Sequence, residues 1–183
     1  MLNIIKTIEK IRLVPVIVIH DKDKAIGLGE SLINGGLPCA EITFRTSAAD
    51  EVIKILRSTF PQMLIGAGTV LNVEQAKRAV DDGASFIVSP GISTNIIKWC
   101  QINEITVMPG IATATEIMVA RDYDIKVLKY FPSEVMGGTR AIKALGGPFP
   151  EVRFIPSGGI NENNVKEYLR LHNIKAVSGT WFV

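Results

Sequence analysis

The chain alternates short apolar stretches, rich in β-branched residues, with longer amphipathic stretches. Eight apolar stretches predict strands over residues 14–19, 39–44, 63–70, 85–90, 105–110, 126–132, 152–156 and 176–181. Between them, apolar residues recur at helical spacing over residues 24–34, 48–59, 73–82, 95–103, 115–121, 139–145 and 163–171. Single helices between successive strands indicate right-handed βαβ units and therefore a parallel sheet.

The predicted strands are apolar with little alternation, as expected of parallel strands that are covered on both faces. Eight such units close naturally into a (β/α)8 TIM barrel, so we expect an α/β fold in which residues 1–183 form a single domain. The alternative is an open, doubly wound sheet. His20-Asp21-Lys22-Asp23 follows the first predicted strand, where a dinucleotide-binding fold has a glycine-rich turn. This difference favours the barrel.

The two ends of the sequence carry further expectations. Residues 3–11 predict an extra amphipathic helix, and we expect the segment 1–12 to close the bottom of the barrel. No helical pattern follows the eighth predicted strand in this sequence, so the final helix of a complete barrel is absent from it. A further segment or a partner surface is expected to cover strands one and eight.

Composition excludes several classes of function. The 183-residue chain is 47% hydrophobic with a net charge of +2 and no run of basic residues, so no nucleic-acid partner is expected. The sequence shows no secretory leader pattern and no run of about 18 apolar residues, so we expect a cytoplasmic protein without a membrane partner. Cys39 and Cys100 form no CxxC motif and are expected to be buried, reduced thiols. No cluster of ligands predicts a metal or another cofactor.

Function on such a barrel is expected at the carboxyl ends of the strands, where one lysine stands out. Lys129 lies in the otherwise apolar stretch VLKYFP, residues 127–132, and alternation puts Val127, Lys129 and Phe131 on one face. If that face points inward, loss of hydration favours the neutral amine, which is the nucleophile that forms a Schiff base with a ketone. The alternative is a strand-end lysine whose ammonium group reaches solvent.

Three polar side chains on the second predicted strand also share a face. Glu41, Thr43 and Arg45 alternate with apolar residues that suit packing beneath helices, so the polar side chains should point inward. Arg45 would lie nearest the open end, where its planar guanidinium can pair with a carboxylate. Glu41 is placed to act as a general acid/base. The alternative is a structural ion pair between Glu41 and Arg45.

Glycine-rich sequences follow several of the apolar stretches, namely GAGT at 66–69, PG at 90–91, PG at 109–110, SGG at 157–159 and SGT at 178–180. Glycine permits positive φ and close approach of the backbone to a ligand. The loops after strands seven and eight form the recurrent phosphate site of TIM barrels, with backbone N–H groups as donors. The sequence therefore predicts a phosphate site there, although each loop alone could be a tight turn.

Six motifs occur in order along the chain, namely EITFRT at 41–46, GAGTV at 66–70, SPG at 89–91, MPG at 108–110, KYFPSE at 129–134 and PSGG at 156–159. Together they resemble the bacterial 2-keto-3-deoxy-6-phosphogluconate (KDPG) aldolases, also known as 4-hydroxy-2-oxoglutarate aldolases. The likeness runs from about Val14 to Val183. It implies a class I aldolase that reversibly cleaves KDPG to pyruvate and glyceraldehyde 3-phosphate, without a cofactor and as a homotrimer.

The resemblance also implies roles for the residues at matching positions. Lys129 would form the Schiff base, and Glu41 would be the general acid/base. Arg45 would hold the pyruvate-derived carboxylate. The pocket around the reacting atoms would be lined by Thr69, Pro90, Phe131 and Ser157, and the phosphate would be bound by Gly158, Gly159 and Thr180.

Two departures from the family pattern bear on the substrate. Ser157 stands where the family has threonine, which leaves the stereochemical preference open, and Thr180 stands where serine is common. The alternative substrates are therefore 4-hydroxy-2-oxoglutarate and 2-keto-3-deoxy-6-phosphogalactonate. A non-catalytic phosphosugar-binding barrel is a more remote alternative. Glu41, Arg45 and Lys129 are all present in the sequence, and a protein that only binds phosphate would require none of them.

Overall fold

A computed structural model of the protein describes residues 4–181; residues 1–3 and 182–183, which include the predicted start of the first helix and the end of the chain, lie outside the described part. The strands are β1 (Leu13–Ile17), β2 (Cys39–Thr43), β3 (Leu64–Gly68), β4 (Phe86–Val88), β5 (Thr106–Met108), β6 (Gly110–Ile111), β7 (Val127–Tyr130), β8 (Arg153–Pro156) and β9 (Val177–Gly179). The helices are α1 (Ile4–Ile11), α2 (Ala25–Asn34), α3 (Ala49–Thr59), α4 (Val73–Asp81), α5 (Thr94–Ile102), α6 (Ala114–Asp122), α7 (Gly138–Gly146) and α8 (Val165–Leu169), with a short 3-10 helix over Lys22–Lys24.

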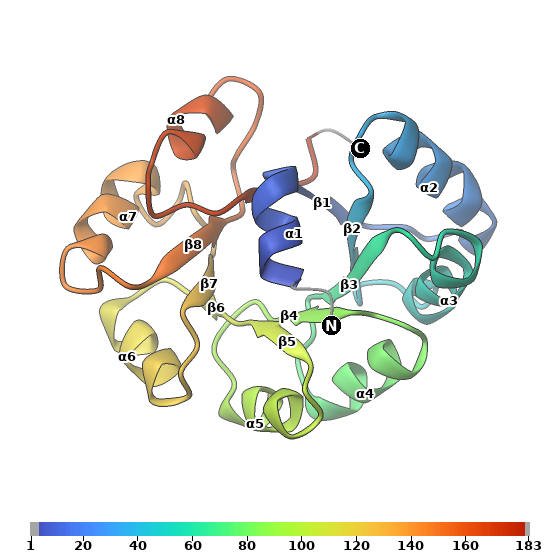
Figure 1. The fold of residues 1–183 in the computed structure, drawn as a ribbon, viewed down its shortest axis with the longest axis horizontal. Coiled ribbons are helices and arrows are strands. Elements are labelled where there is room, and N and C mark those ends of the chain that lie inside the picture. The colour runs from blue at the N-terminus through green and yellow to red at the C-terminus, as the bar shows by residue number, and fades with distance from the viewer. Residues whose placement is uncertain (1–3, 182–183) are drawn as a thin grey trace.

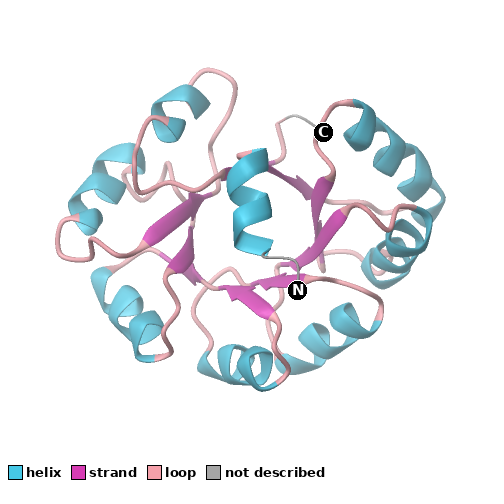
Figure 2. Ribbon diagram, in the orientation of Figure 1, coloured by secondary structure: helices cyan, strands magenta, loops and turns pink. Residues whose placement is uncertain are grey.

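The strands form a curled, parallel arrangement, which confirms the predicted α/β class. Six strands pair in the order β5-β4-β3-β2-β1-β9 and three in the order β6-β7-β8. Figure 2 shows these strands in the centre of the molecule with helices around the outside. Parallel bridges between Phe154 and Ile174 and between Ser157 and Ser178 bring the end of the second sheet to the β9 edge of the first.

One predicted strand is interrupted. The stretch 105–110 forms two strands, β5 and β6, which are separated by Pro109. Proline has no backbone N–H group and cannot donate to the strand ladder. The carbonyl of Pro109 instead accepts a hydrogen bond from the backbone N–H of Lys129 at 3.0 Å. This hydrogen bond therefore sets the register of Lys129 on β7 relative to the segment between β5 and β6.

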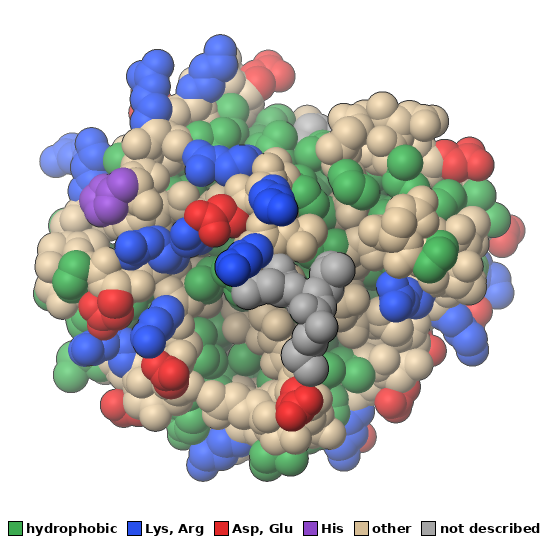
Figure 3. All heavy atoms as spheres, in the orientation of Figure 1, with side chains coloured by type: hydrophobic (Ala, Val, Ile, Leu, Met, Phe, Trp, Pro, Cys, Tyr) green, Lys and Arg blue, Asp and Glu red, His purple; other side chains and the backbone are tan. Residues whose placement is uncertain are grey.

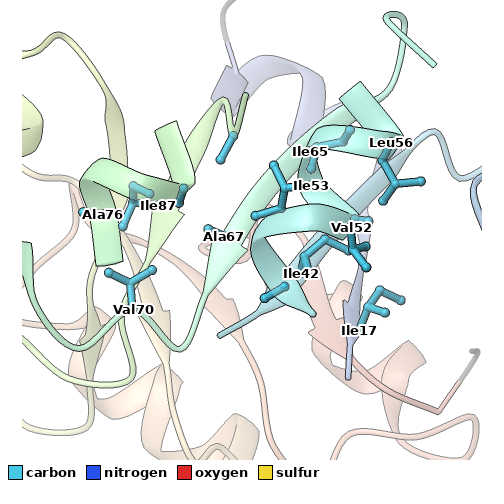
Figure 4. Close-up of a cluster of buried hydrophobic side chains, with 14 of the residues drawn as sticks. Ile17, Ile42, Val52, Ile53, Leu56, Ile65, Ala67, Val70, Ala76 and Ile87 are labelled. Carbon is cyan, nitrogen blue, oxygen red and sulfur yellow. The ribbon is translucent and has the colours of Figure 1, made fainter. Parts of the chain in front are cut away.

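Apolar residues pack on both faces of the strands. On the outer face, Ile42 and Ile65 contact the buried side of α3, which carries Val52, Ile53 and Leu56 (Figure 4). The inner face forms a separate cluster that includes Val14, Cys39, Leu64, Phe86, Val88, Met108, Ile155 and Ala176. This division follows from the alternation of side chains along each strand.

Helix α1 covers the centre of the strand arrangement in Figure 1. Its Ile8 is fully buried and belongs to the inner cluster. Glu9 forms an ion pair with Lys175, which lies just before β9, and Arg12 Nη2 donates to the carbonyl of Leu169 at 2.6 Å. These contacts attach the amphipathic N-terminal helix to one end of the strands.

Both cysteines are buried, free thiols, as the sequence predicts. Burial raises the pKa of Cys39 and that of Cys100 to about 12, and the nearby charge of Glu41 adds to the effect at Cys39. Between residues 4 and 181, the structure has no helix with the length and apolar character needed to cross a bilayer.

Candidate active site

The centre of the strand arrangement holds a buried pair of oppositely charged groups. Lys129 on β7 and Glu41 on β2 are 6% and 2% exposed, and Lys129 Nζ lies 3.1 Å from Glu41 Oε1. Lys129 therefore does not reach solvent, which rules out the alternative of a strand-end surface lysine. The ammonium group also lies 5.4 Å from the centre of the Phe131 ring.

Glycine at position 68 makes room for the Glu41 side chain. Gly68 ends β3 next to β2, and a Cβ atom added there would overlap the Glu41 carboxylate. On the inner face below, Phe86 fills the space that a side chain at Gly66 would need. The glycines of the GAGT sequence thus serve the packing of neighbouring side chains inside the strands.

Arg45 lies beyond the end of β2 and does not pair with Glu41. Its Nε donates to Thr69 Oγ1 at 3.1 Å, and its side chain is exposed. Thr69 has a positive φ of 51°, which turns the chain sharply at the end of β3. The hydrogen bond to Thr69 uses one of the five N–H groups of the Arg45 guanidinium, so the other donors can bind a ligand.

A cavity of about 240 Å3 opens above Lys129. It is lined by residues from β1, β7 and β9 and from the segments after β2, β7, β8 and β9, namely Val16, Arg45, Lys129, Phe131, Ser157, Gly158, Gly159, Ile160, Gly179 and Thr180. The cavity brings together seven of the residues that the sequence predicts for the site. Glu41 and Thr69 do not line the cavity themselves. Glu41 accepts a hydrogen bond from Lys129, which does, and Thr69 accepts one from Arg45.

The glycine loop after β8, residues 157–160, is held by its carbonyl groups. The carbonyl of Ser157 accepts from the N–H of Ser133 at 2.7 Å, and that of Gly158 accepts from the N–H of Glu134 at 3.0 Å. The carbonyl of Gly159 accepts from the Asn164 side-chain amide at 3.1 Å.

The direction of these carbonyls decides where the loop can donate. The C=O and N–H groups of a trans peptide point in opposite directions. Holding the carbonyls of Ser157 and Gly158 on the backbone of Ser133 and Glu134 therefore turns the N–H groups of Gly158 and Gly159 away from that segment. Positive φ values of 94° at Gly158 and 81° at Gly159 permit this course of the chain. Successive backbone donors of this kind form an anion site.

Comparison with known proteins identifies the family of the chain. Residues 4–183 match the family described as "Aldolase: KDPG and KHG aldolase". The chain belongs to this family. It is 43% identical to the 2-dehydro-3-deoxy-phosphogluconate aldolase of Treponema pallidum (strain Nichols), over all of this chain and 87% of that relative. It is 39% identical to the KHG/KDPG aldolase of Escherichia coli (strain K12), over 93% of this chain and 80% of the relative.

Solved structures of KDPG aldolases have the same fold. The enzyme of Legionella pneumophila, with pyruvate captured at low pH as a covalent carbinolamine intermediate, has a TM-score of 0.92 and 41% identity, and the match covers 94% of this chain and 84% of that one. The enzyme of Zymomonas mobilis ZM4 with 3-phosphoglycerate has a TM-score of 0.94 and 37% identity, with 98% and 86% covered.

Not every residue expected from the aldolase resemblance lies on the cavity. Pro90 is absent from its lining, and a Cβ atom added at Gly110 would overlap the Pro90 carbonyl. The close packing of Pro90 on Gly110 is what the structure shows at this position. Conversely, Val16 and Ile160 line the cavity but were not predicted from the sequence. The alternation of β1 indicates Val16, since it shares a face with Val14, whereas no local signal indicates Ile160.

Ser178 is a further inward-facing residue, which was predicted only as part of a glycine-rich loop. It is 1% exposed and lines a small space inside the strands together with Lys129 and Glu41. Its hydroxyl has no hydrogen-bond partner among the described residues. It is therefore a third polar group, beside Lys129 and Glu41, in a space whose other lining residues are apolar.

A larger hollow lies outside the strand arrangement, at the end of β1 beside α2. Its volume is about 890 Å3, and its surface is mainly apolar, with Asp23 and Lys24 as its charged residues. It lacks a buried acid–base pair of the kind formed by Lys129 and Glu41. Size alone therefore does not identify the reacting centre of this aldolase-family protein.

Proposed function

We propose that the protein is a class I aldolase that reversibly cleaves KDPG to pyruvate and glyceraldehyde 3-phosphate, with Lys129 as the Schiff-base lysine. The observation that carries the proposal is the buried Lys129–Glu41 pair beneath a cavity that also holds Arg45 and the glycine loop. The pyruvate carbinolamine of the Legionella pneumophila relative is the adduct expected when an amine attacks the carbonyl of pyruvate.

The first half of the proposed reaction forms the Schiff base. Glu41 Oε1, 3.1 Å from Nζ, accepts the proton that the Lys129 ammonium group must lose. The neutral amine then attacks the C2 carbonyl of KDPG to give a carbinolamine. Glu41 returns the proton to the C2 hydroxyl, which leaves as water, and a protonated imine (iminium) remains on Lys129.

The second half breaks the carbon–carbon bond. Glu41, now a carboxylate, takes the proton of the C4 hydroxyl, directly or through water, and the electrons of the C3–C4 bond move to the iminium. Glyceraldehyde 3-phosphate leaves, and an enamine remains. Glu41 protonates C3 of the enamine, and water then hydrolyses the pyruvate iminium to restore Lys129.

Binding at the two ends of the substrate would position the reacting bond between them. We assign the substrate carboxylate to the exposed guanidinium of Arg45, whose planar group pairs with carboxylates. We assign the phosphate to the N–H groups of Gly158 and Gly159 and to Thr180, since loops after the last two strands of such folds bind phosphate. Thr69, Phe131 and Ser157 would surround the middle of the substrate, and Pro90 would act from outside the observed cavity.

A second substrate, 4-hydroxy-2-oxoglutarate, is supported by the smaller side chain at position 157. Ser157 is 5% exposed and lines the cavity, so it presents a hydroxyl without the methyl group of threonine. The name of the Escherichia coli relative includes both activities. Specific rates on phosphorylated and unphosphorylated substrates would separate the two.

We also infer that the two sheets close into one (β/α)8 barrel that forms a single domain over the whole chain. The bridges from Phe154 and Ser157 to the β9 edge support closure on one side, and the Lys129–Pro109 hydrogen bond supports it on the other. A homotrimer is proposed from the family resemblance. Sedimentation equilibrium would measure the mass of the assembly directly.

Trapping of the Schiff base tests the proposed chemistry. The protein is incubated with pyruvate, reduced with borohydride and digested, and the modified peptide is located by mass spectrometry. We expect an adduct on Lys129 that is lost in Lys129→Ala. Lys77→Ala, which removes an exposed lysine on α4, is the matched control and should leave the adduct in place. An adduct that persists in Lys129→Ala would refute the assignment.

A further inference from the structure

Tyr168 on α8 holds two consecutive residues of the segment that follows β7. Its hydroxyl donates to Glu134 Oε1 and lies 2.9 Å from Ser133 Oγ. Tyr168 is 1% exposed and Ser133 is fully buried, whereas Glu134 is exposed apart from this contact. One buried hydroxyl thus ties an exposed carboxylate to the interior.

The same two residues hold the glycine loop. The backbone N–H groups of Ser133 and Glu134 donate to the carbonyls of Ser157 and Gly158. The Glu134 side chain also lies over Gly159, since a Cβ atom added at Gly159 would be 2.6 Å from Glu134 Cβ and Cγ. Movement of this segment would therefore change the direction of the donors at Gly158 and Gly159.

The other side of the glycine loop is held by residues next to α8. Asn164, which directly precedes α8, donates to the carbonyl of Gly159 at 3.1 Å, and its Oδ1 accepts from the N–H of Asn161. The start of α8 therefore contacts one side of the glycine loop, while Tyr168 of the same helix fixes the segment that holds the other side. Helix α8 is the common support of both.

Tyr168 remains a hydrogen-bond donor over the whole working range of pH. Burial raises the pKa of Tyr168, and its hydrogen bond to the Glu134 carboxylate raises it further. A neutral phenol beside an ionised carboxylate gives a charge-assisted hydrogen bond, which is stronger than one between neutral groups. This bond is therefore suited to keep a surface segment in one position.

We propose that Tyr168 and Glu134 are positioning residues that set the glycine loop for the phosphate end of the substrate. The proposal rests on the function proposed above and extends it to residues that do not line the observed cavity. Lys129 and Arg45 hold the pyruvate end from β7 and from the segment after β2. Loss of the Tyr168–Glu134 hydrogen bond should therefore weaken recognition of the phosphate and leave the chemistry on pyruvate intact.

Two reactions of the same protein separate the two ends of the substrate. Cleavage of KDPG uses the phosphate site, whereas exchange of the methyl protons of pyruvate with deuterium needs only the Schiff base and its acid/base group. In Tyr168→Phe we expect KM for KDPG to rise about tenfold, the equivalent of one lost hydrogen bond, while the rate of pyruvate exchange stays within about twofold. An unchanged KM for KDPG, or an equal loss in both reactions, would overturn the proposal.

Substitutions at the exposed partner test the same contact without altering the core. Glu134→Ala removes the acceptor and should raise KM for KDPG as Tyr168→Phe does. Glu134→Gln keeps an acceptor for the Tyr168 hydroxyl and should restore KM to within about twofold of the unsubstituted protein. A rise in KM in Glu134→Gln equal to that in Glu134→Ala would show that the hydrogen bond is not what matters.

Tyr130→Phe is the matched control for loss of a buried tyrosine hydroxyl. Tyr130 is 1% exposed, and its hydroxyl donates at 2.6 Å to the carbonyl of Met136, whereas the hydrogen bonds to the glycine-loop carbonyls come from Ser133 and Glu134. We expect KM for KDPG to be unchanged in this variant. Absence of pyruvate exchange in the unsubstituted protein would contradict the proposed function itself, which keeps that failure distinct from failure of the positioning role.

Discussion

Gly68 lies against the carboxylate of Glu41, and a Cβ atom at position 68 would be 2.5 Å from Glu41 Cγ and would overlap its carboxylate. Thr43 and Gly68 are partners in the pairing of β2 with β3, so the glycine faces the side chain that comes from two residues earlier on β2. The position of Glu41, the proposed acid/base group, thus depends on a residue that has no side chain.

Gly68→Ala should displace Glu41 from Lys129. Overpacking in a tight interior commonly costs about 1–3 kcal/mol of stability, and the displaced carboxylate can no longer exchange a proton with Nζ. We expect the rate of Schiff-base trapping with pyruvate to fall at least about tenfold, because a general acid/base contributes at least that much. Gly27→Ala is the control, since nothing lies within 4 Å of a Cβ atom there; normal trapping in Gly68→Ala would contradict this account of the glycine.

The Lys129–Glu41 pair makes a prediction about stability that is separate from activity. Lys129→Met would leave the Glu41 carboxylate buried without its partner, and such losses cost about 3 kcal/mol. Adding Glu41→Leu removes the unpaired charge, so the double variant should recover most of the free energy of unfolding while remaining inactive. Chemical denaturation of the three proteins measures both effects.

An exposed ion pair provides the comparison. Lys77 Nζ lies 3.0 Å from Glu74 Oε1 on the surface of α4, where such pairs contribute about 0–1 kcal/mol. Lys77→Met should therefore change the free energy of unfolding far less than Lys129→Met does. Equal effects of the two substitutions would mean that the burial of the Lys129–Glu41 pair has no energetic consequence.

Ser178 offers a substitution that should stabilise the protein. A buried hydroxyl without a partner retains its desolvation penalty, about 1–3 kcal/mol, and Ser178 Oγ has no partner among the described residues. Ser178→Ala removes the hydroxyl with little change in volume, so we expect a higher midpoint of thermal unfolding. Ser133→Ala is the contrasting variant, because the Ser133 hydroxyl is bonded to Tyr168, and it should lower that midpoint.

The order of strands and helices could be predicted because it depends on local periodicity. Alternation along the strands predicted that Glu41 points inward and put Lys129 on one face with Val127 and Phe131, but it left open whether that face is the inner one, since side-chain direction along a strand has a period of two. The break at Pro109 was missed, although proline is a local signal against a continuous strand. The stretch 105–110 is apolar on both sides of Pro109, but β5 pairs with β4 whereas β6 pairs with β7, a difference that the apolar pattern does not reveal.

Contacts between distant segments could not be predicted in this way. Tyr168 and Glu134 are 34 residues apart in the sequence. Tyr168 fits the helical pattern of α8 and Glu134 follows the strand β7, so neither local pattern indicates that the two side chains meet. Whether Glu41 pairs with Arg45 or with Lys129 also depends on how the strands curl, because both partners were compatible with the alternation of β2. The resemblance to the aldolases implied roles for Glu41, Arg45 and Lys129 that periodicity could not, but it gave no indication of the contact between Tyr168 and Glu134.

The two cysteines predict how stability changes at alkaline pH. Burial raises the pKa of Cys39 and of Cys100 from 9.0 to about 12 in the folded protein. In the unfolded chain the thiols ionise near the lower value, so the unfolded state releases protons first as the pH rises. The contribution of the buried thiols to stability is therefore complete below about pH 9 and is lost as the pH rises toward about 12.

Denaturation at pH 8 and at pH 10.5 measures this contribution. Tyrosines and lysines also titrate in this range, so the comparison protein carries Cys39→Ala and Cys100→Ala. We expect the free energy of unfolding to fall more steeply between the two pH values in the unsubstituted protein than in the double variant. Both thiols should also resist alkylation at pH 8 until the protein is unfolded, because the thiolate is the reactive form. Parallel slopes for the two proteins, or rapid alkylation of the folded chain, would mean that the thiols ionise without unfolding.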